Sequence, residues 1–272
     1  QYDVHRTAGL VADKLKEFGL DEVVTGIGRT GVVGVIRGKG NSSGKTVGLR
    51  ADMDALPIQE IRDLPHKSQT DGKMHACGHD GHTAMLLGAA RHLAENRDFD
   101  GTVVVIFQPA EEGGAGGKAM VDDGMMERFG IQEVYGMHNV PGMPVGTFAS
   151  KVGPLMAAAD LIEITIEGKG AHAAMPHNGV DTVVVASAVV QALQSIVARN
   201  VDPLDQAVIS VTQIHAGDAF NVIPQVAELA GTVRTFLPET RDMAERRIAE
   251  VCAGVAAAYG ATITPTYTRN YP

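Results

Sequence analysis

The stretch TVVVIF, residues 102–107, decides the fold class of this chain. It has no polar alternation, which is typical of a strand covered on both faces of a parallel sheet. The hydrophobic pattern predicts further strands at 31–37, 46–51 and 133–137, and helices at 11–18, 82–95 and 116–123. Because strands alternate with helices, the sequence predicts an α/β fold with a mostly parallel sheet.

The pattern changes near residue 152. Residues 161–167 alternate between apolar and polar side chains, as a half-exposed strand does. A helix, two strands, a helix and a strand are then expected, at 181–198, 207–215, 227–236, 238–259 and 261–269. This β-α-β-β-α-β order predicts a ferredoxin-like domain. We therefore expect two domains, residues 1–152 and 153–270, with the boundary near Gly153.

Composition excludes several classes of protein. The 272 residues carry 23 Lys and Arg against 32 Asp and Glu, a net charge of −9, which argues against nucleic-acid and polybasic membrane-surface proteins. The sequence has no run of 18 or more apolar residues, so no membrane span is predicted. Two cysteines, Cys77 and Cys252, do not form a disulfide scaffold, so the reducing cytoplasm is the expected compartment. Cys252 falls on an apolar helical stripe and is expected in the core.

Histidines cluster in one part of the chain, at His66, His75, His79, His82 and His92. Residues 75–82, HACGHDGH, form a loop too polar and flexible to make a good core. Thiolate and imidazole together suit zinc or a similar metal, although an isolated Cys-x-His pair can also be a buried thiol beside a surface histidine. A cysteine nucleophile is disfavoured, because a histidine two residues away in an extended loop usually points the other way.

Carboxylates and a histidine follow three of the expected strands, which is where an open α/β sheet binds its ligands. They are Asp52 and Asp54, Glu111 and Glu112, and His138. Of two adjacent carboxylates, one can bind a metal while the next acts as general base towards a water. The ordinary alternatives are a solvated acidic turn, aspartates that cap a turn, and a strand-end histidine with a structural role.

The second expected domain has its own candidates. GKGAHAAMPH, residues 168–177, places His172 in a loop between a strand and a helix. This loop is either an ordinary turn or a lid that carries a polar group to a substrate. Asn221 and Arg234 are similar candidates, and arginine suits a bidentate contact with a carboxylate.

Five motifs together resemble a known family: LRADMDALP (49–57), MHACGHDGHTAMLLGAA (74–90), FQPAEEGGAGGKAMVDDG (107–124), YGMHNVPG (135–142) and GKGAHAAMPHNGVD (168–181). They are similar to the dinuclear metal amidohydrolases of the hippurate hydrolase and N-acyl-amino-acid amidohydrolase type, which includes the auxin-conjugate hydrolases. The resemblance implies a zinc-exopeptidase-like catalytic domain with the ferredoxin-like domain inserted as a lid and dimerisation domain. It also implies hydrolysis of an N-acyl amino acid to a carboxylic acid and a free amino acid.

The resemblance also implies roles for single residues. Cys77 would bridge two divalent metal ions (Zn, Mn, Co or Ni), with His79, Glu112 and His138 as further ligands. Glu111 would be the general base and acid. Asp54 would contact a metal ligand and orient it, without binding the metal itself. His172 would stabilise the oxyanion, often in the partner subunit's site, and Asn221 and Arg234 would bind the substrate.

One departure from the family pattern leads us to expect a truncated chain. Family members return to the catalytic domain after the lid, which supplies a last metal-binding histidine, and they begin with an R-x-x-H-x-x-P-E element. Residues 1–272 contain neither. A homodimer or tetramer with a small-molecule substrate is expected, and a non-catalytic, dimerising binding module is the alternative function. The acyl group, the amino acid and the metal stay open.

Overall fold

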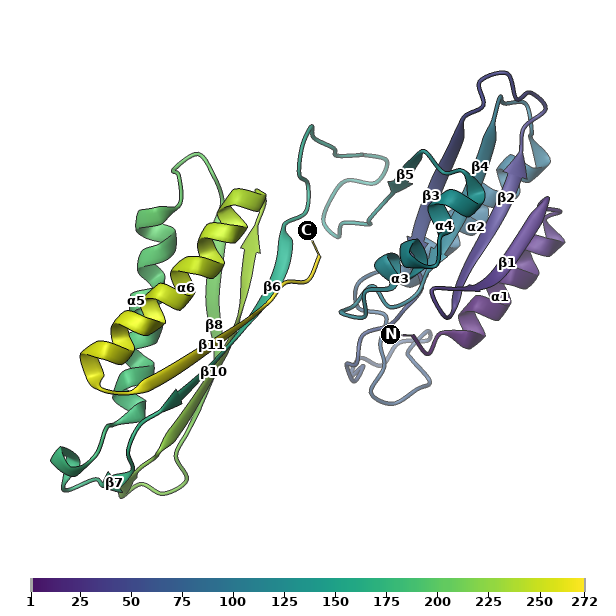
Figure 1. Cartoon of the computed structure of the whole chain (residues 1–272). Helices are drawn as coiled ribbons and strands as arrows, with labels where there is room; N and C mark the ends of the chain where they lie inside the picture. Colours follow the sequence, from purple (N-terminus) through teal and green to yellow (C-terminus); the bar gives the residue numbers. More distant parts are fainter. Residues whose placement is uncertain (1, 272) are drawn as a thin grey trace. The chain divides into compact units, whose positions relative to one another are not determined.

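The apolar stretch at residues 102–107 lies in β4 (Thr102–Gln108), the central strand of a five-stranded sheet. The computed structural model describes residues 2–271, and the chain divides into two units between Thr147 and Phe148 (Figure 1). Val105 and Phe107 pack on one face of the sheet, and Val104 and Ile106 pack on the other. The expectation of a strand covered on both faces is confirmed.

The sheet of the first unit is mixed, with strand order β1-β2-β4-β3-β5. β1 (Glu22–Ile27) and β2 (Gly31–Arg37) pair antiparallel, and β2 is antiparallel to β4. β3 (Thr46–Asp52) runs parallel to both β4 and β5 (Glu133–Gly136). The mostly parallel sheet expected from the sequence is therefore corrected to a mixed one. The physical reason is the short link between β1 and β2, since so short a turn joins only antiparallel strands.

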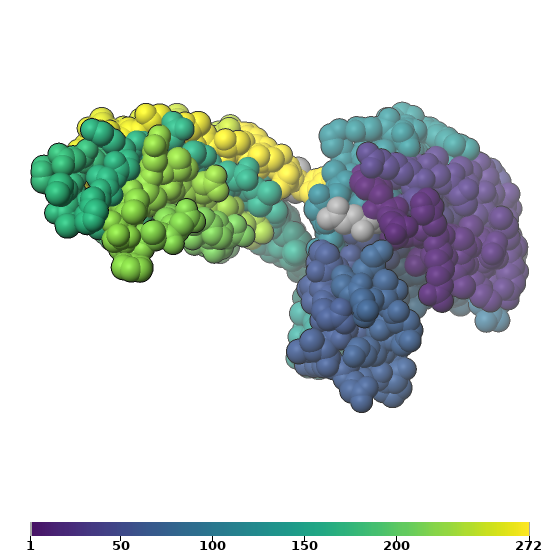
Figure 2. All heavy atoms as spheres, turned by 90° about the horizontal axis from the view of Figure 1, so that it is seen from below, coloured from purple at the N-terminus to yellow at the C-terminus, as the bar shows by residue number. Residues whose placement is uncertain are grey.

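Helices cover both faces of this sheet. α1 (His5–Glu17) and α2 (His79–Glu95) contribute to one apolar cluster, and residues of α3 (Gly116–Asp122) and α4 (Met125–Phe129) contribute to the other. The sequence did not predict β1 or α4. α2 begins three residues earlier than expected, which places His79 in its first turn. Figure 2 shows the long segment between β3 and α2 in blue at the surface of the first unit.

The second unit has the predicted β-α-β-β-α-β order. β6 (Ala158–Glu167), β8 (Ala207–Ala216), β10 (Val226–Thr235) and β11 (Thr262–Thr268) form an antiparallel sheet in the order β11-β6-β10-β8. α5 (Thr182–Asn200) and α6 (Pro238–Tyr259) cover one face of it (Figure 1). β7 (Ala171–His172) and β9 (Val222–Ile223) form a separate two-stranded ladder, and Pro176–Asn178 is a short 3-10 helix.

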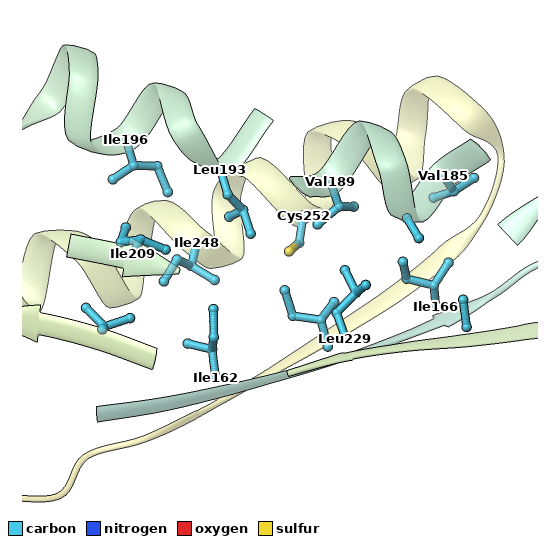
Figure 3. Packing of buried hydrophobic residues seen from close by; sticks show 14 of the residues in the cluster. Ile162, Ile166, Val185, Val189, Leu193, Ile196, Ile209, Leu229, Ile248 and Cys252 are labelled. Atoms are coloured by element: carbon cyan, nitrogen blue, oxygen red, sulfur yellow. The ribbon is translucent and has the colours of Figure 1, made fainter. Parts of the chain in front are cut away.

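One continuous core joins this sheet to its two helices. Side chains of α5 and α6 point towards Ile162 and Leu229 of the sheet (Figure 3). Cys252 is fully buried among them, as predicted. By length and composition alone, α5 is long and apolar enough to cross a membrane, although the sequence predicted no membrane span. Its buried apolar residues, however, belong to this core, and core helices of globular domains can have the same length and composition.

Candidate metal centre

The candidate residues of the first unit meet at one edge of its sheet. Asp54 follows β3, Glu111 and Glu112 follow β4, and His138 follows β5. Cys77 and His79 lie at the start of α2, whose N-cap residue is a glycine. The parallel arrangement of β3, β4 and β5 brings their carboxyl ends to the same side, which is why residues far apart in sequence come together.

His79 is the centre of this group and is almost fully buried. Its Nδ1 lies 2.9 Å from the main-chain oxygen of Asp54, which can only accept, so Nδ1 donates and, in the neutral ring, Nε2 carries the lone pair. Within residues 2–271, Nε2 has no hydrogen-bond partner. Three carboxylate oxygens surround it at 3.6–3.9 Å, from Asp52, Glu111 and Glu112. A buried, unpartnered lone pair among carboxylates fits a bound cation, since a buried polar atom without a partner is otherwise costly.

Cys77 and His138 form the second part of the site. The Cys77 Sγ lies 3.5 Å from Nε2 of His138, whose Nδ1 donates to the main-chain oxygen of Asn139 at 2.7 Å. Burial, together with the charge of Glu112, raises the pKa of Cys77 to about 11. Without a metal the thiol is therefore protonated near neutral pH. This disfavours the thiol-nucleophile alternative, because a nucleophilic cysteine needs a lowered pKa.

Glu111 and Glu112 lie on a constrained turn. Ala110 and Ala115, on either side of them, adopt φ values of 50° and 60°, a region that non-glycine residues rarely occupy. The carboxylate of Asp54 accepts hydrogen bonds from the main-chain nitrogens of both glutamates. Burial and the negative charge of Glu112 raise the pKa of Glu111, as suits a residue that takes up and releases a proton.

The donor set fits a metal such as zinc. In two groups the ligand atoms all lie within 4.8 Å of one another: Cys77, His79 and His138, and His79, Glu111 and Glu112. Sulfur, imidazole nitrogen and carboxylate oxygen are the ligands of zinc sites in proteins. The two groups share His79, so the predicted ligands form one cluster.

A buried network that the sequence did not reveal lies behind these ligands. Arg50 donates to Asp52 at 2.7 Å, and the other oxygen of Asp52 lies 2.7 Å from Nδ1 of His82. Although burial raises the pKa of Asp52, the hydrogen bond with His82 and the charge of Arg50 bring it below its ordinary value. Asn139 completes the network and was not a candidate. The signal that could have identified it is its place directly after His138.

In the second unit, two of the three candidates are neighbours. His172 pairs with Val222 in the β7–β9 ladder, and the main-chain nitrogen of Ala173 donates to the main-chain oxygen of Asn221. Arg234 lies near the far end of β10, eight residues beyond Val226. At about 3.4 Å per residue this is roughly 27 Å along the strand. One copy of this unit therefore brings His172 and Asn221 together but keeps Arg234 away from them.

The fold, together with the cysteine, histidine and carboxylate groups that meet at one edge of the first sheet, is that of a family of metallopeptidases. The model of the peptidase family M20/M25/M40 matches residues 48–251, and the chain belongs to this family. It is 50% identical to hippurate hydrolase of Campylobacter jejuni over 94% of this chain and 66% of that protein. It is 48% identical to N-acetylcysteine deacetylase of Bacillus subtilis, over 86% of this chain and 60% of that protein.

A plant relative and a solved structure extend this comparison. IAA-amino acid hydrolase ILR1-like 5 of Arabidopsis thaliana is 44% identical, over 92% of this chain and 56% of that protein. The crystal structure of the Bacillus subtilis YXEP protein, a dinuclear metal binding peptidase of the M20 family, matches with a TM-score of 0.80 and 39% identity. That match covers 98% of this chain and 68% of the other. The chain spans 56 to 66% of the length of the three curated relatives.

Proposed function

We propose that this protein is a metal-dependent amidohydrolase that cleaves N-acyl amino acids, of the hippurate or N-acetyl amino acid kind, to a carboxylic acid and a free amino acid. The observation that carries the proposal is Nε2 of His79, buried and without a hydrogen-bond partner in residues 2–271, with three carboxylate oxygens at 3.6–3.9 Å. The named activities of the hippurate hydrolase and N-acetylcysteine deacetylase relatives support the substrate class.

Four residues would hold two divalent ions, with Zn, Mn, Co and Ni as the candidate metals. They are Cys77 as the shared ligand, with His79, Glu112 and His138. When bound, the ions lower the pKa of a shared water and polarise the amide carbonyl. The proton on the Cys77 thiol must leave for the metals to bind, because only the thiolate is a ligand.

Glu111 is the proposed general base and acid. Its carboxylate takes a proton from the water as the water oxygen adds to the amide carbon. It then delivers that proton to the amide nitrogen as the C–N bond breaks, which leaves a carboxylic acid and an amine. Because burial and Glu112 raise its pKa, Glu111 holds the proton between the two steps better than an ordinary glutamate would.

The second unit is the proposed lid and dimerisation domain. His172 would stabilise the oxyanion, and Asn221 and Arg234 would bind the substrate. About 27 Å of strand separates Arg234 from the start of β10. Arg234 and Asn221 can therefore bind the same substrate only if they come from two copies of the chain. The proposed roles therefore require a homodimer.

The edge of the second sheet supports that homodimer. β8, Ala207–Ala216, is an edge strand of ten residues and contains no Lys, Arg, Asp, Glu or Pro. Native proteins normally protect an edge with such residues, and the opposite edge strand, β11, carries Pro265. A second copy that pairs with β8 through a two-fold axis would cover it.

Replacement of Glu111 by glutamine tests the chemistry. We expect Glu111→Gln to lose hydrolysis of hippurate and N-acetyl amino acids by at least about 100-fold while it keeps its metal content, because removal of a general base costs 10²–10⁴-fold. Glu112→Gln should lose metal as well as activity, and the surface variant Glu127→Gln should change neither. Metal analysis by mass spectrometry separates these cases. Full activity in Glu111→Gln would contradict the proposal.

A panel assay decides between an enzyme and a binding module. The wild-type protein is tested against N-acyl amino acids with benzoyl, acetyl and indolyl groups, in the presence of zinc, manganese, cobalt or nickel. The alternative of a non-catalytic, dimerising module predicts a dimer with no bound metal and no turnover under any of these conditions. We also propose a cytoplasmic location, since Cys77 and Cys252 are both free.

A further inference from the structure

We infer that His82 and Asn139 are positioning residues that aim His138 at Cys77. A chain of contacts runs from the buried carboxylate of Asp52 through His82 and Asn139 to His138. The inference rests on the proposed metal centre, but it assigns roles to two residues that are not among the proposed ligands.

The inner end of this chain is rigid. His82 and Asp52 are both buried, and Nδ1 of His82 lies 2.7 Å from Oδ1 of Asp52. The same aspartate is held by Arg50 on its other oxygen and, at its main-chain oxygen, by the hydroxyl of Thr83 at 2.9 Å. These contacts of Asp52 therefore fix the orientation of the His82 ring.

The outer nitrogen of His82 contacts Asn139 twice. With Nδ1 donating to the carboxylate of Asp52, Nε2 accepts from the main-chain nitrogen of Asn139 at 3.1 Å and lies 2.9 Å from the side-chain amide of Asn139. Both ring nitrogens of His82 are thus engaged by the protein. Asp52, His79 and His82 lie close enough to hold an ion, but His82 has no nitrogen left to bind one. The geometry of His82 therefore suits a residue that holds Asn139 in place, and not a metal ligand.

One glycine of the HACGHDGH motif, Gly78, makes room for the Asn139 side chain. A Cβ on Gly78 would lie 2.2 Å from the amide oxygen of Asn139, and Gly78 also has a φ of +90° that L side chains rarely adopt. A Cβ on Gly81 would lie 3.5 Å from the amide nitrogen, which is an ordinary contact, so the requirement for glycine falls on Gly78 alone. The motif therefore supplies Cys77 and His79 and also the place where Asn139 sits.

The last contact sets the direction of His138. Its Nδ1 donates to the main-chain oxygen of Asn139 at 2.7 Å, so Nε2 keeps its lone pair and faces the Cys77 sulfur at 3.5 Å. The ring also packs edge-on against His82, with centroids 4.5 Å apart. His138 is exposed and follows β5, whose four residues are all exposed, so little other packing orients it. A hydrogen bond to the far nitrogen is the usual way to orient a histidine ligand.

Cobalt binding tests the inference without reliance on turnover. The metal-free full chain is titrated with Co²⁺, and the thiolate-to-cobalt absorption reports occupancy at Cys77. We expect Asn139→Ala and His82→Gln to weaken this binding by about 10–100-fold. Excess metal should restore most of kcat and leave KM unchanged. His92→Ala, an exposed histidine on the same helix, should bind Co²⁺ like the wild type.

The outcomes separate the inference from the proposal on which it rests. If the wild-type protein binds no Co²⁺, the metal centre itself is wrong and this inference falls with it. If the wild type binds Co²⁺ and both variants bind it with unchanged affinity, only the positioning roles are wrong. Asn139 is exposed on an irregular segment, so Asn139→Ala keeps the test decisive even if His82→Gln does not fold.

Discussion

Asp54 and Glu111 are joined by a hydrogen bond of 3.0 Å, in which the main-chain nitrogen of Glu111 donates to Oδ1 of Asp54. The second oxygen of Asp54 accepts from the main-chain nitrogen of Glu112 at 3.2 Å. The same carboxylate lies 3.3 Å from Nδ1 of His79. One buried side chain thus links the proposed ligand His79 to the turn that carries the proposed base. Although burial raises the pKa of Asp54, the bonds from His79 and the two main-chain nitrogens bring it below its ordinary value.

Replacement of Asp54 by asparagine should therefore displace the turn. An amide cannot accept two hydrogen bonds in the way both carboxylate oxygens do, so one main-chain nitrogen loses its partner. Because a displacement of about 1 Å can cost 10²-fold in rate, we expect kcat to fall about 100-fold with a smaller change in KM. The matched control is Asp123→Asn, since Asp123 also accepts from a main-chain nitrogen, that of Gly28, away from the site. Steady-state kinetics of both variants decide; equal kcat losses would contradict the prediction.

Metal removal should leave Cys77 as a slowly reacting thiol. With its pKa raised to about 11, only a small fraction is thiolate at pH 8. We expect alkylation of the metal-free protein by iodoacetamide to accelerate steadily between pH 7 and pH 10, without the plateau that an ordinary thiol reaches. Cys77→Ser should not be labelled, because Cys252 is fully buried. A rate profile with its midpoint near pH 8.5 and a plateau above that pH would refute the raised pKa.

A charge on the exposed edge of the second unit should prevent dimer formation. Ile214 lies in β8 and is 55% exposed. We expect Ile214→Lys to shift the protein to a monomer, because a lysine at an edge strand opposes pairing with another strand. Thr266→Lys, on the opposite edge strand β11, is the control and should leave the dimer intact. Analytical ultracentrifugation measures both. Dimers of unchanged affinity in Ile214→Lys would place the interface elsewhere.

The second unit contains a buried ion pair that should make its stability depend on pH. Asp160 is fully buried and accepts from Arg241 at 2.7 Å and from the hydroxyl of Tyr267 at 2.6 Å. Burial raises the pKa of Asp160, but these hydrogen bonds outweigh it and lower the pKa below the ordinary value. The carboxylate therefore stabilises the folded state above about pH 4, and this contribution is lost as the pH falls through the folded-state pKa.

Asp160→Asn measures that contribution. We expect it to lower the free energy of unfolding by about 3 kcal/mol at pH 7, since it leaves Arg241 without its charge partner. The difference from wild type should shrink below pH 4. Asp242→Asn breaks an exposed pair with Arg269 and should cost less than about 1 kcal/mol. Urea unfolding at pH 7 and pH 3 provides the comparison, and a difference that stays constant between the two would show that the charge of Asp160 is unimportant.

Much of the architecture was predictable because it depends on local patterns. The period of apolar residues located β2 and α6 at the bounds that the structure has, and most other elements within a few residues. Strand direction was not predictable in the same way. The mixed character of the first sheet depends on which strands pair, and β1 was missed because its residues are only partly buried.

The amino-acid sequence by itself determined which residues could form the candidate site, because cysteine, histidine and glutamate after strand ends are the chemistry that metals need. The tertiary structure alone decided how these residues meet. Only there does Nε2 of His79 prove to lack a hydrogen-bond partner within residues 2–271, and only there does Arg234 prove to lie far from Asn221. It also revealed Asn139, whose role depends on contacts 57 residues away at His82. Such contacts are set by the pairing of strands, which local patterns do not encode.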